Sequence, residues 1–588
     1  MGDRCHEVVH GIYADIRHSG SPVERPQLAS STVLCEVNAV IVECRLDNLL
    51  QLIGQKLTPQ KLEDTLFLLK VEIEKLEGNI IEVEVNPDRQ DMLSAEGIAR
   101  AIRAFLGIDT RLKTYSVRKS GKQVVVKSGL ERIRPFISCG IVKGVQMSDD
   151  LLKDYMHLQE LLTTTHGRNR KKASIGLYVL NDIEFPILYV PERPDSIKFA
   201  PLGQESAIDG PTILNTHEKG LLYGPIISGF KKWPLLKDSR GCILSLPPVI
   251  NSNDLGRITV DVHDLFVEVT GTQKSCVDQA LNIVLTSLAD RGGKIESVTV
   301  VYPDGTETET PDLTPSKMIL TTDEVVQLTG LVLKDQDVVD CLKKMCYGAR
   351  VLSKGKVAVG IPPFRTDILH PVDVMEDVAI GYGFDKIQPT MPVTTTTGRL
   401  LPKTRFKNKA RDLMVGSGYQ EVMTYVMSSP DVMNSKMMRD NQLVTTGNPK
   451  SIDYSVLRNS LLPALLDFTS QNQHADCPQR VFEVGDVVIP DERSETQSTQ
   501  RTSVCGLVSD GRVNITNVIA ELTFVLRNLG LDGKFKFVSA RNPSFVEGRS
   551  ADILLGQARI GSFGEVSPEV LSRFGIGNPT AAFEFSLP

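Results

Sequence analysis

Residues 362–385 read PPFRTDILHPVDVMEDVAIGYGFD, and this segment organises the elements on either side of it. An alternating apolar pattern before it predicts a strand that ends at the double proline, because proline cannot donate to a sheet ladder. Pro371 then suits the first turn of a helix, since its φ angle is already close to helical. Gly381 and Gly383 are expected to end that helix.

Four acidic side chains gather around the start of this predicted helix. Asp373, Glu376 and Asp377 are three and four residues apart, so their carboxylates share one helix face. Asp367 lies in the turn before the helix. Together they form an all-oxygen set, which suits a hard divalent cation such as Mg²⁺. The same acids would offset the positive end of the helix dipole without any metal, and spacing alone favours that simpler role.

The composition is that of a globular protein with several domains. Of its 588 residues, 41% are hydrophobic and 23% charged, and the net charge of −6 gives no overall basic field for nucleic acid. The ten cysteines include no C-x-x-C pair, which predicts reduced thiols. Because no signal peptide and no membrane-spanning apolar run is apparent, we expect a soluble, cytoplasmic protein.

The segment contains the pattern P-x-x-R-x-D-I-L-x-x-x-D-x-x-E-D-x-A-x-x-Y-G. This pattern resembles the signature of the metal-bearing domain of the phenylalanyl-tRNA synthetase β chain, in its archaeal and eukaryotic cytosolic form. In that family the acids that correspond to Asp367, Asp373, Glu376 and Asp377 bind Mg²⁺. The resemblance therefore implies Mg²⁺ as the cofactor of this chain.

The resemblance extends over nearly the whole chain from about Thr32. Four further stretches match the family in order: NPDRQDMLSAEGIARAI (86–102), NPKSIDYSVLRNSLLPALL (448–466), PQRVFEVGDVV (478–488) and NPSFVEGRSADI (542–553). Within the first of these, Arg89-Gln-Asp91-Met-Leu echoes Arg365-Thr-Asp367-Ile-Leu, and each motif precedes a predicted helix that contains Glu. The echo hints at an internal repeat, although so short a match also arises by chance.

The element patterns and the resemblance together predict an α+β protein of several domains. A strand-like pattern at 71–85 and a helix from about Ser94 to Phe105 belong to the first domain. We expect a mobile extension at 1–31, an N-terminal α+β domain at 32–112, a mixed α/β editing domain at 118–301, the metal-bearing domain at 315–387 and an antiparallel-sheet domain like that of class II aminoacyl-tRNA synthetases at 398–588.

The last domain lacks the residues of a working class II site. Such a site needs a strand-borne Arg-x-Glu and a Gly-x-Gly-x-x-x-Arg segment, because adenylate formation depends on positioned cations. The expected strands 419–427 and 480–488 carry no such arginine, Arg493-Ser-Glu495 lies in a polar loop expected at 491–502, and Gly575-Ile-Gly577 is followed by no arginine. We therefore expect a catalytically degenerate domain, with no ligation residue in this chain and the ligation site on a separate α chain.

Polar, turn-prone clusters in residues 118–301 lie beside apolar strand patterns, at THEKG (216–220), PPVINSND (247–254) and FVEVTGT (266–272). Loops of this kind can converge on a pocket, and the resemblance implies a domain that hydrolyses tyrosyl-tRNA. The candidate editing residues are His217, Glu218, Asn251, Asn253 and Thr270. Ordinary turn chemistry accounts for the same residues without any function.

The resemblance implies the β subunit of a phenylalanine–tRNA ligase. Two α and two β chains would attach phenylalanine to tRNA-Phe with ATP and Mg²⁺, and this chain would contribute tRNA contacts, an interface with α and editing. One alternative is a β-like module that binds tRNA or protein partners without chemistry. Another is a free-standing deacylase of mischarged tRNA.

Overall fold

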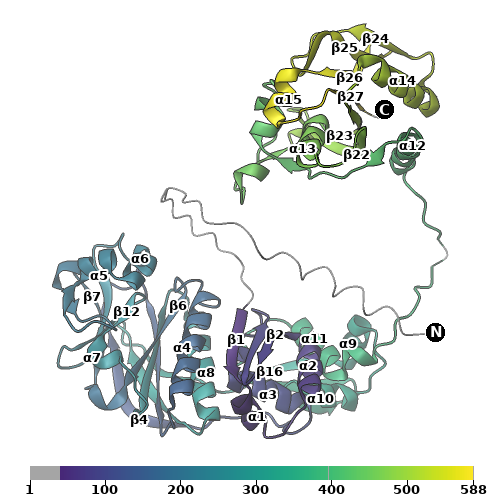
Figure 1. Ribbon diagram of the computed structural model, residues 1–588. Coiled ribbons are helices and arrows are strands. Elements are labelled where there is room, and N and C mark those ends of the chain that lie inside the picture. The colour runs from purple at the N-terminus through teal and green to yellow at the C-terminus, as the bar shows by residue number, and fades with distance from the viewer. Residues whose placement is uncertain (1–39, 395, 587–588) are drawn as a thin grey trace. The chain divides into compact units, whose positions relative to one another are not determined.

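The computed structural model describes residues 40–394 and 396–586, and Figure 1 shows their helices and strands. These residues divide into two compact units, residues 40–391 and 392–586, each with its own sheets and hydrophobic cores. The extension predicted at residues 1–31 lies outside the described residues. None of the described helices is long and apolar enough to cross a membrane.

A three-stranded antiparallel sheet opens the first unit, with the strand order β1-β3-β2. Its strands are β1 (Val40–Arg45), β2 (Val71–Glu77) and β3 (Ile80–Val85), and its helices are α1 (Leu46–Ile53), α2 (Pro59–Leu68) and α3 (Ala95–Phe105). The hairpin of β2 and β3 and the start of α3 confirm the predicted patterns. Ser94 caps α3, because its hydroxyl accepts a hydrogen bond from the N–H of Gly97 at 3.2 Å.

The end of the first unit repeats this arrangement. A second three-stranded antiparallel sheet has the order β16-β18-β17. Its strands are β16 (Ser316–Thr321), β17 (Gly348–Ser353) and β18 (Lys356–Ile361), and its helices are α9 (Thr322–Thr329), α10 (Asp335–Lys344) and α11 (Pro371–Tyr382). Both parts run strand–helix–helix–strand–strand–helix with the third strand in the middle, so the echo in the sequence reflects a structural repeat.

The echoed motifs also bring the two repeats together. In each repeat the arginine of the motif holds the aspartate two residues later, through its Nε atom at 2.9 Å. Gln90 and Thr366 stand between the arginine and the aspartate of their motifs, and the hydroxyl of Thr366 donates to Gln90 Oε1 at 2.8 Å. Equivalent residues of the two repeats therefore meet at their junction.

A ten-stranded mixed sheet lies between the repeats in the sequence, in the order β12-β11-β10-β7-β4-β14-β5-β13-β6, with β15 beside β14. Only β4 runs parallel to its neighbours. The strands are β4 (Val117–Val126), β5 (Phe136–Lys143), β6 (Ala173–Val179), β7 (Ile187–Glu192), β10 (Trp233–Lys237), β11 (Ile243–Leu246), β12 (Ile250–Asn251), β13 (Leu265–Gly271), β14 (Lys294–Val301) and β15 (Glu307–Thr310). Helices α4 (Asp149–Thr164) and α8 (Lys274–Asp290) pack on one face, in a core that continues into the first repeat.

Shorter elements complete this part of the unit: β8 (Lys198–Phe199), β9 (Ile208–Asp209), α5 (Gly210–Thr216), α6 (Glu218–Tyr223) and α7 (Asn253–Gly256). β8 and β9 form a two-stranded sheet of their own, and the three larger sheets of the first unit lie near the predicted segments 32–112, 118–301 and 315–387, although β15 extends to Thr310. The division of the chain into five domains stays a prediction.

A seven-stranded sheet forms the second unit, in the order β19-β22-β23-β27-β26-β25-β24. Only β19 and β22 are parallel neighbours. The strands are β19 (Gln420–Glu421), β22 (Gln479–Pro490), β23 (Ser498–Ser509), β24 (Phe535–Ser539), β25 (Phe545–Leu555), β26 (Ala558–Val566) and β27 (Thr580–Ser586), with β20 (Met427–Ser428) and β21 (Val456–Leu457) as a separate pair. Helices α12 (Pro402–Gly416) and α14 (Ile515–Leu526) pack on one face, and α13 (Leu462–Gln471) and α15 (Pro568–Phe574) on the other.

Two predictions for the second unit need correction. The strand expected at 419–427 is reduced to β19 and the start of β20, because only two of its residues pair with β22. The polar loop expected at 491–502 ends at Gln497, since β23 begins at Ser498 and pairs there with Pro490. Polar side chains are compatible with this hairpin because the ladder bonds involve only the backbone.

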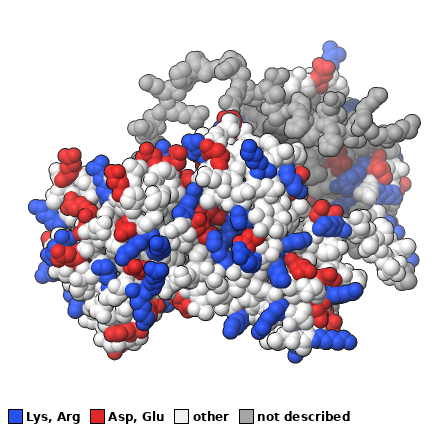
Figure 2. All heavy atoms as spheres, turned by 90° about the horizontal axis from the view of Figure 1, so that it is seen from below, with Lys and Arg blue, Asp and Glu red and all other residues white. Residues whose placement is uncertain are grey.

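Acidic and basic side chains are interspersed over the face of the molecule that Figure 2 shows. The formal net charge of the whole sequence is −6. Both observations agree with the expectation from composition that no overall basic field marks this protein. Contacts with a polyanion must therefore depend on local groups.

The end of α11 differs from the prediction at one glycine. Gly383 ends the helix with a φ angle of 101°, as expected, but Gly381 lies inside the helix. A Cβ atom at residue 381 would lie 2.3 Å from the carbonyl oxygen of Cys341 in α10. Residue 381 is a glycine because α10 and α11 approach closely there, not because the helix stops.

We expect Gly381→Ala to destabilise the first unit by about 1–3 kcal/mol, since the added methyl group must push two packed helices apart. Denaturant unfolding of the full chain measures this change. Gly416→Ala is the matched control, because Gly416 ends α12 and a Cβ atom there meets nothing within 4 Å. Equal unfolding midpoints for the parent and Gly381→Ala would contradict the packing explanation.

Candidate functional site

The acidic cluster predicted from the sequence lies at the junction of the two repeats. Arg365, whose side chain is 1% exposed, holds two of its members together. Its Nη2 atom donates to Asp377 Oδ2 at 2.6 Å and to Asp367 Oδ2 at 2.7 Å. Asp377 is buried, so its carboxylate lies on the side of α11 that also carries buried apolar residues.

The other two acids have partners of a different kind. Asp373 Oδ2 accepts hydrogen bonds from the backbone N–H groups of Leu369 and His370, both at 2.7 Å, so it secures the first turn of α11. Glu376 is exposed, and its Oε1 atom accepts from Lys70 Nζ at 2.8 Å. Lys70 belongs to the first repeat, so this pair also joins the repeats.

All four acids line one cavity of about 180 Å³. Carboxylate oxygens are the donors that Mg²⁺ prefers, so the cavity fits this ion in donor chemistry. The side chains of Lys70, Arg89 and Arg365 line the same cavity, and they already offset the acidic charge. Within residues 40–394 and 396–586, no three His, Cys, Asp or Glu side chains converge closely enough to hold a metal ion. A cation at this cavity must therefore compete with the protein's own positive groups.

A second cavity, of about 420 Å³, lies beside α4 in the part of the first unit predicted to edit. Asn251 and Asn253 line it. Tyr155 and Gln159 line it from α4, and neither the Tyr155 hydroxyl nor the Gln159 amide nitrogen has a hydrogen-bond partner among the described residues. Buried polar groups without partners are rare, so these two atoms are suited to a polar ligand.

Sequence reasoning missed both α4 residues. Tyr155 falls in the buried stripe of α4, where an aromatic residue is normal core, and Gln159 is one polar residue among many on the helix. No local pattern marks them, because their role depends on loops about a hundred residues later in the chain.

A buried carboxylate lies behind this cavity. Glu268 on β13 is 2% exposed, and its Oε1 atom accepts a hydrogen bond from the Tyr178 hydroxyl at 3.0 Å. Its Oε2 atom has no partner in the described part of the chain. Burial raises the pKa of Glu268 to about 7, although Tyr178 and the Arg134 guanidinium oppose the shift. The Tyr178 hydroxyl also lies 3.4 Å from Asn251 Oδ1, so Glu268 is connected to the cavity wall.

The remaining candidates lie outside the residues that line this cavity. Thr270 is fully buried, and its Oγ1 atom accepts from Arg134 Nε at 3.0 Å. His217 caps α6, because its Nδ1 atom accepts from the backbone N–H of Lys219 at 3.1 Å. Glu218 is exposed in the first turn of that helix. The structure thus brings Asn251 and Asn253 together and leaves the other three candidates apart from them.

The motif fragments of the second unit have ordinary structural roles. Arg493 and Glu495 lie at the tip of the hairpin between β22 and β23. Gly575 ends α15 in the left-handed conformation, with a φ angle of 73°. The loss of the ligation site stays a prediction.

Comparisons with known proteins identify the family. The model of the phenylalanyl tRNA synthetase beta chain CLM domain matches residues 387–587, and that of the tRNA synthetase B5 domain matches residues 318–384. Curated relatives described as phenylalanine–tRNA ligase beta subunits include one from Methanococcoides burtonii, 39% identical over 527 residues that cover 89% of this chain and 95% of the relative. Another, from Thermococcus gammatolerans, is 39% identical over 91% of this chain and 96% of the relative.

A solved structure agrees with these sequence matches. It is described as an N-terminal fragment of the phenylalanyl-tRNA synthetase beta subunit from Pyrococcus horikoshii, and it is 39% identical to this chain. The match covers 58% of this chain and 99% of the fragment, with a TM-score of 0.56. The resemblance drawn from residues 362–385 is confirmed along about nine-tenths of the chain. The chain belongs to the family of phenylalanine–tRNA ligase beta subunits.

Proposed function

We propose that this beta subunit assembles with alpha chains, as two α and two β chains in the cytoplasm, and that the complex attaches phenylalanine to tRNA-Phe with ATP. The match to beta subunits over about nine-tenths of the chain is the observation that carries this proposal. The ligation site would lie on the α chain. Co-purification with an α chain separates this function from the two alternatives, a tRNA- or protein-binding module without chemistry and a free-standing deacylase.

A class II synthetase-like fold is proposed for the second unit. Its seven-stranded, mainly antiparallel sheet with helices on both faces supports this assignment. The strand β22 ends at Pro490 without the Arg-x-Glu that would hold an α-phosphate. The second unit would therefore keep the class II fold but no longer catalyse adenylate formation.

The cavity beside α4 supports hydrolytic editing of tyrosyl-tRNA. An apolar pocket built for phenylalanine rejects an isostere with one added hydroxyl only about a hundredfold, so a second site is physically useful. A volume of about 420 Å³ falls in the range of ordinary ligand pockets. Hydrolysis of an activated ester can proceed by positioning water, which demands no nucleophile–base pair.

Buried polar atoms without hydrogen-bond partners would make this cavity bind a tyrosyl group more tightly than a phenylalanyl group. A buried donor or acceptor without a partner costs about 1–3 kcal/mol, and a ligand hydroxyl that pairs with it recovers that energy. Tyr155 and Gln159 offer such groups, which a phenylalanyl ring would leave unpaired, and the Asn251 amide lines the same cavity. The roles of four further candidates in editing stay predictions: His217, Glu218, Asn253 and Thr270.

Mg²⁺ is proposed at Asp367, Asp373, Glu376 and Asp377, as the family resemblance implies. The shared cavity and the oxygen-only donor set support this site. When bound, the ion would supply the charge compensation that Lys70 and Arg365 supply in the structure described here. Its role is thus structural, at the junction of the two repeats.

Asn251→Ala should slow the hydrolysis of tyrosyl-tRNA by the complex about tenfold, because one lost hydrogen bond to the ligand is worth about 1.4 kcal/mol. Deacylation of purified tyrosyl-tRNA by the α–β complex is the measurement. Glu218→Ala tests the other candidate cluster: because Glu218 is exposed outside the cavity, an unchanged rate would remove it from the editing candidates.

Two results would count against editing at this cavity. If the parent complex hydrolyses tyrosyl-tRNA no faster than buffer does, the chain does not edit. If Glu218→Ala is inactive while Asn251→Ala matches the parent, the editing site lies around α6 instead.

For the metal, Asp373→Asn should weaken the binding of Mn²⁺, used as a spectroscopic substitute for Mg²⁺, because one anionic donor is lost. Lys70→Met should strengthen binding, since Lys70 competes for Glu376. Lys75→Met is the control, because Lys75 pairs only with the exposed Glu77. Electron paramagnetic resonance titration of the complex without nucleotide measures all three. Identical affinities in every variant would place the ion elsewhere.

A further inference from the structure

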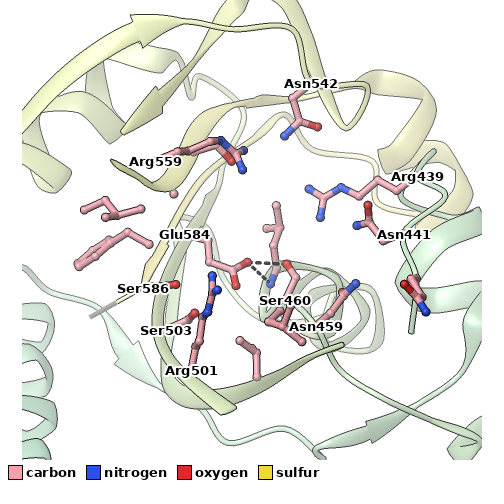
Figure 3. A pocket seen from close by; sticks show the side chains of 18 of the residues that line it. Arg439, Asn441, Asn459, Ser460, Arg501, Ser503, Asn542, Arg559, Glu584 and Ser586 are labelled. Atoms are coloured by element: carbon pink, nitrogen blue, oxygen red, sulfur yellow. Dashed lines mark hydrogen bonds between the residues drawn. The ribbon is translucent and has the colours of Figure 1, made fainter. Parts of the chain in front are cut away.

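The second unit contains a cavity of about 690 Å³ on the face of the sheet that carries α13 and α15 (Figure 3). Strands β22, β23, β26 and β27 form its floor, and loops near residues 438–442, 459–460 and 542–543 surround it. Neither the ligation chemistry nor the proposed editing uses this space.

Three arginines direct their guanidinium groups into this cavity, as Figure 3 shows for Arg439, Arg501 and Arg559. Arg559 pairs with Asp552 at 2.8 Å. Arg439 donates only through Nε, to Ser544 Oγ at 2.7 Å, which leaves its two Nη atoms without a partner in the described part. Arg501 is exposed at the mouth, and no ion pair of the described residues includes it.

The carboxylate inside the cavity is already engaged. Glu584 accepts hydrogen bonds from Ser460 Oγ at 2.6 Å and from the backbone N–H groups of Leu461 and Leu462 at 2.9 and 3.1 Å. It therefore holds the start of α13 and makes no direct contact with the arginines. Burial lowers the pKa of Arg439, Glu584 opposes this, and the neighbouring Arg559 lowers it further.

A half-buried guanidinium without an anionic partner is unfavourable unless a ligand supplies the charge. The planar fork of arginine matches the oxygens of phosphate, and several arginines around one space suit a multiply charged group. The cavity also contains neutral polar groups, among them Asn459, whose buried Oδ1 atom has no hydrogen-bond partner in the described part of the chain. That oxygen needs a hydrogen-bond donor, which a phosphate ester with hydroxyl groups can supply at a distance from the phosphate that the arginines bind.

We propose that this cavity binds a small phosphate ester of about mononucleotide size, with its phosphate between Arg439, Arg501 and Arg559 and a hydroxyl group toward Asn459. We assign the site binding alone, because Glu584 is already engaged at the start of α13 and the described lining contains no histidine, cysteine or lysine. Such a ligand would tie the loop of Arg439 to β23 and β26.

Hydrogen–deuterium exchange on the whole α–β complex tests this site, because it reports on the loop and strands separately from the ligation site of the α chain. The probe is adenosine monophosphate, compared with pyrophosphate and with sodium chloride at equal ionic strength. We expect adenosine monophosphate to slow exchange in peptides that contain residues 438–442 and 498–503. Arg439→Gln and Arg501→Gln should each abolish this protection.

Arg493→Gln is the matched control, because Arg493 is exposed at the tip of the same hairpin and outside the cavity. It should keep the protection of the parent. Since Arg439→Gln can disturb folding, Arg501→Gln at the mouth decides the outcome. Protection that survives in Arg501→Gln, or that sodium chloride reproduces, overturns the proposal. Protection by pyrophosphate alone overturns the assignment to an ester.

Discussion

Two buried arginines form ion pairs at the junction of the two repeats of the first unit. Arg89 and Arg365 occupy equivalent places in the two repeats, and each holds the aspartate two residues later. Removing one partner of a buried ion pair costs about 3–5 kcal/mol, so such a pair constrains everything that packs around it. Gln90 and Thr366 each stand between the arginine and the aspartate of an ion pair, and their side chains form a hydrogen bond with each other. The two ion pairs therefore stabilise both the inside of each repeat and the junction of the repeats.

Local patterns predicted the repeat elements well, because hairpins, caps and helix stripes depend on neighbouring residues. They were wrong or incomplete where the role of a residue depends on a contact with a distant part of the chain. Gly381 is read locally as a helix end, whereas the carbonyl of Cys341 in another helix requires it. Local spacing also could not predict that Glu376 pairs with Lys70, which lies 306 residues away, and the part of Glu376 as a metal ligand stays a prediction. Likewise, Tyr155 becomes part of a cavity only when the loop of Asn251 folds against α4.

The two units use polar groups in different ways. In the first, the cavity beside α4 leaves neutral groups without partners, which suits discrimination between side chains that differ by one hydroxyl. In the second, three arginines line a larger space, and the described residues give Arg439 and Arg501 no carboxylate partner, which suits an anion. Both arrangements are compatible with the proposal that this beta subunit supports and checks a reaction performed by another chain.

Phenylalanine-dependent exchange between ATP and pyrophosphate tests most directly whether this chain is a beta subunit without a ligation site of its own. The purified single chain is compared with the same chain assembled with an α chain. No exchange above background is expected from the single chain, and robust exchange from the complex. Robust phenylalanine-dependent exchange by the single chain would contradict the loss of the ligation site in residues 392–586.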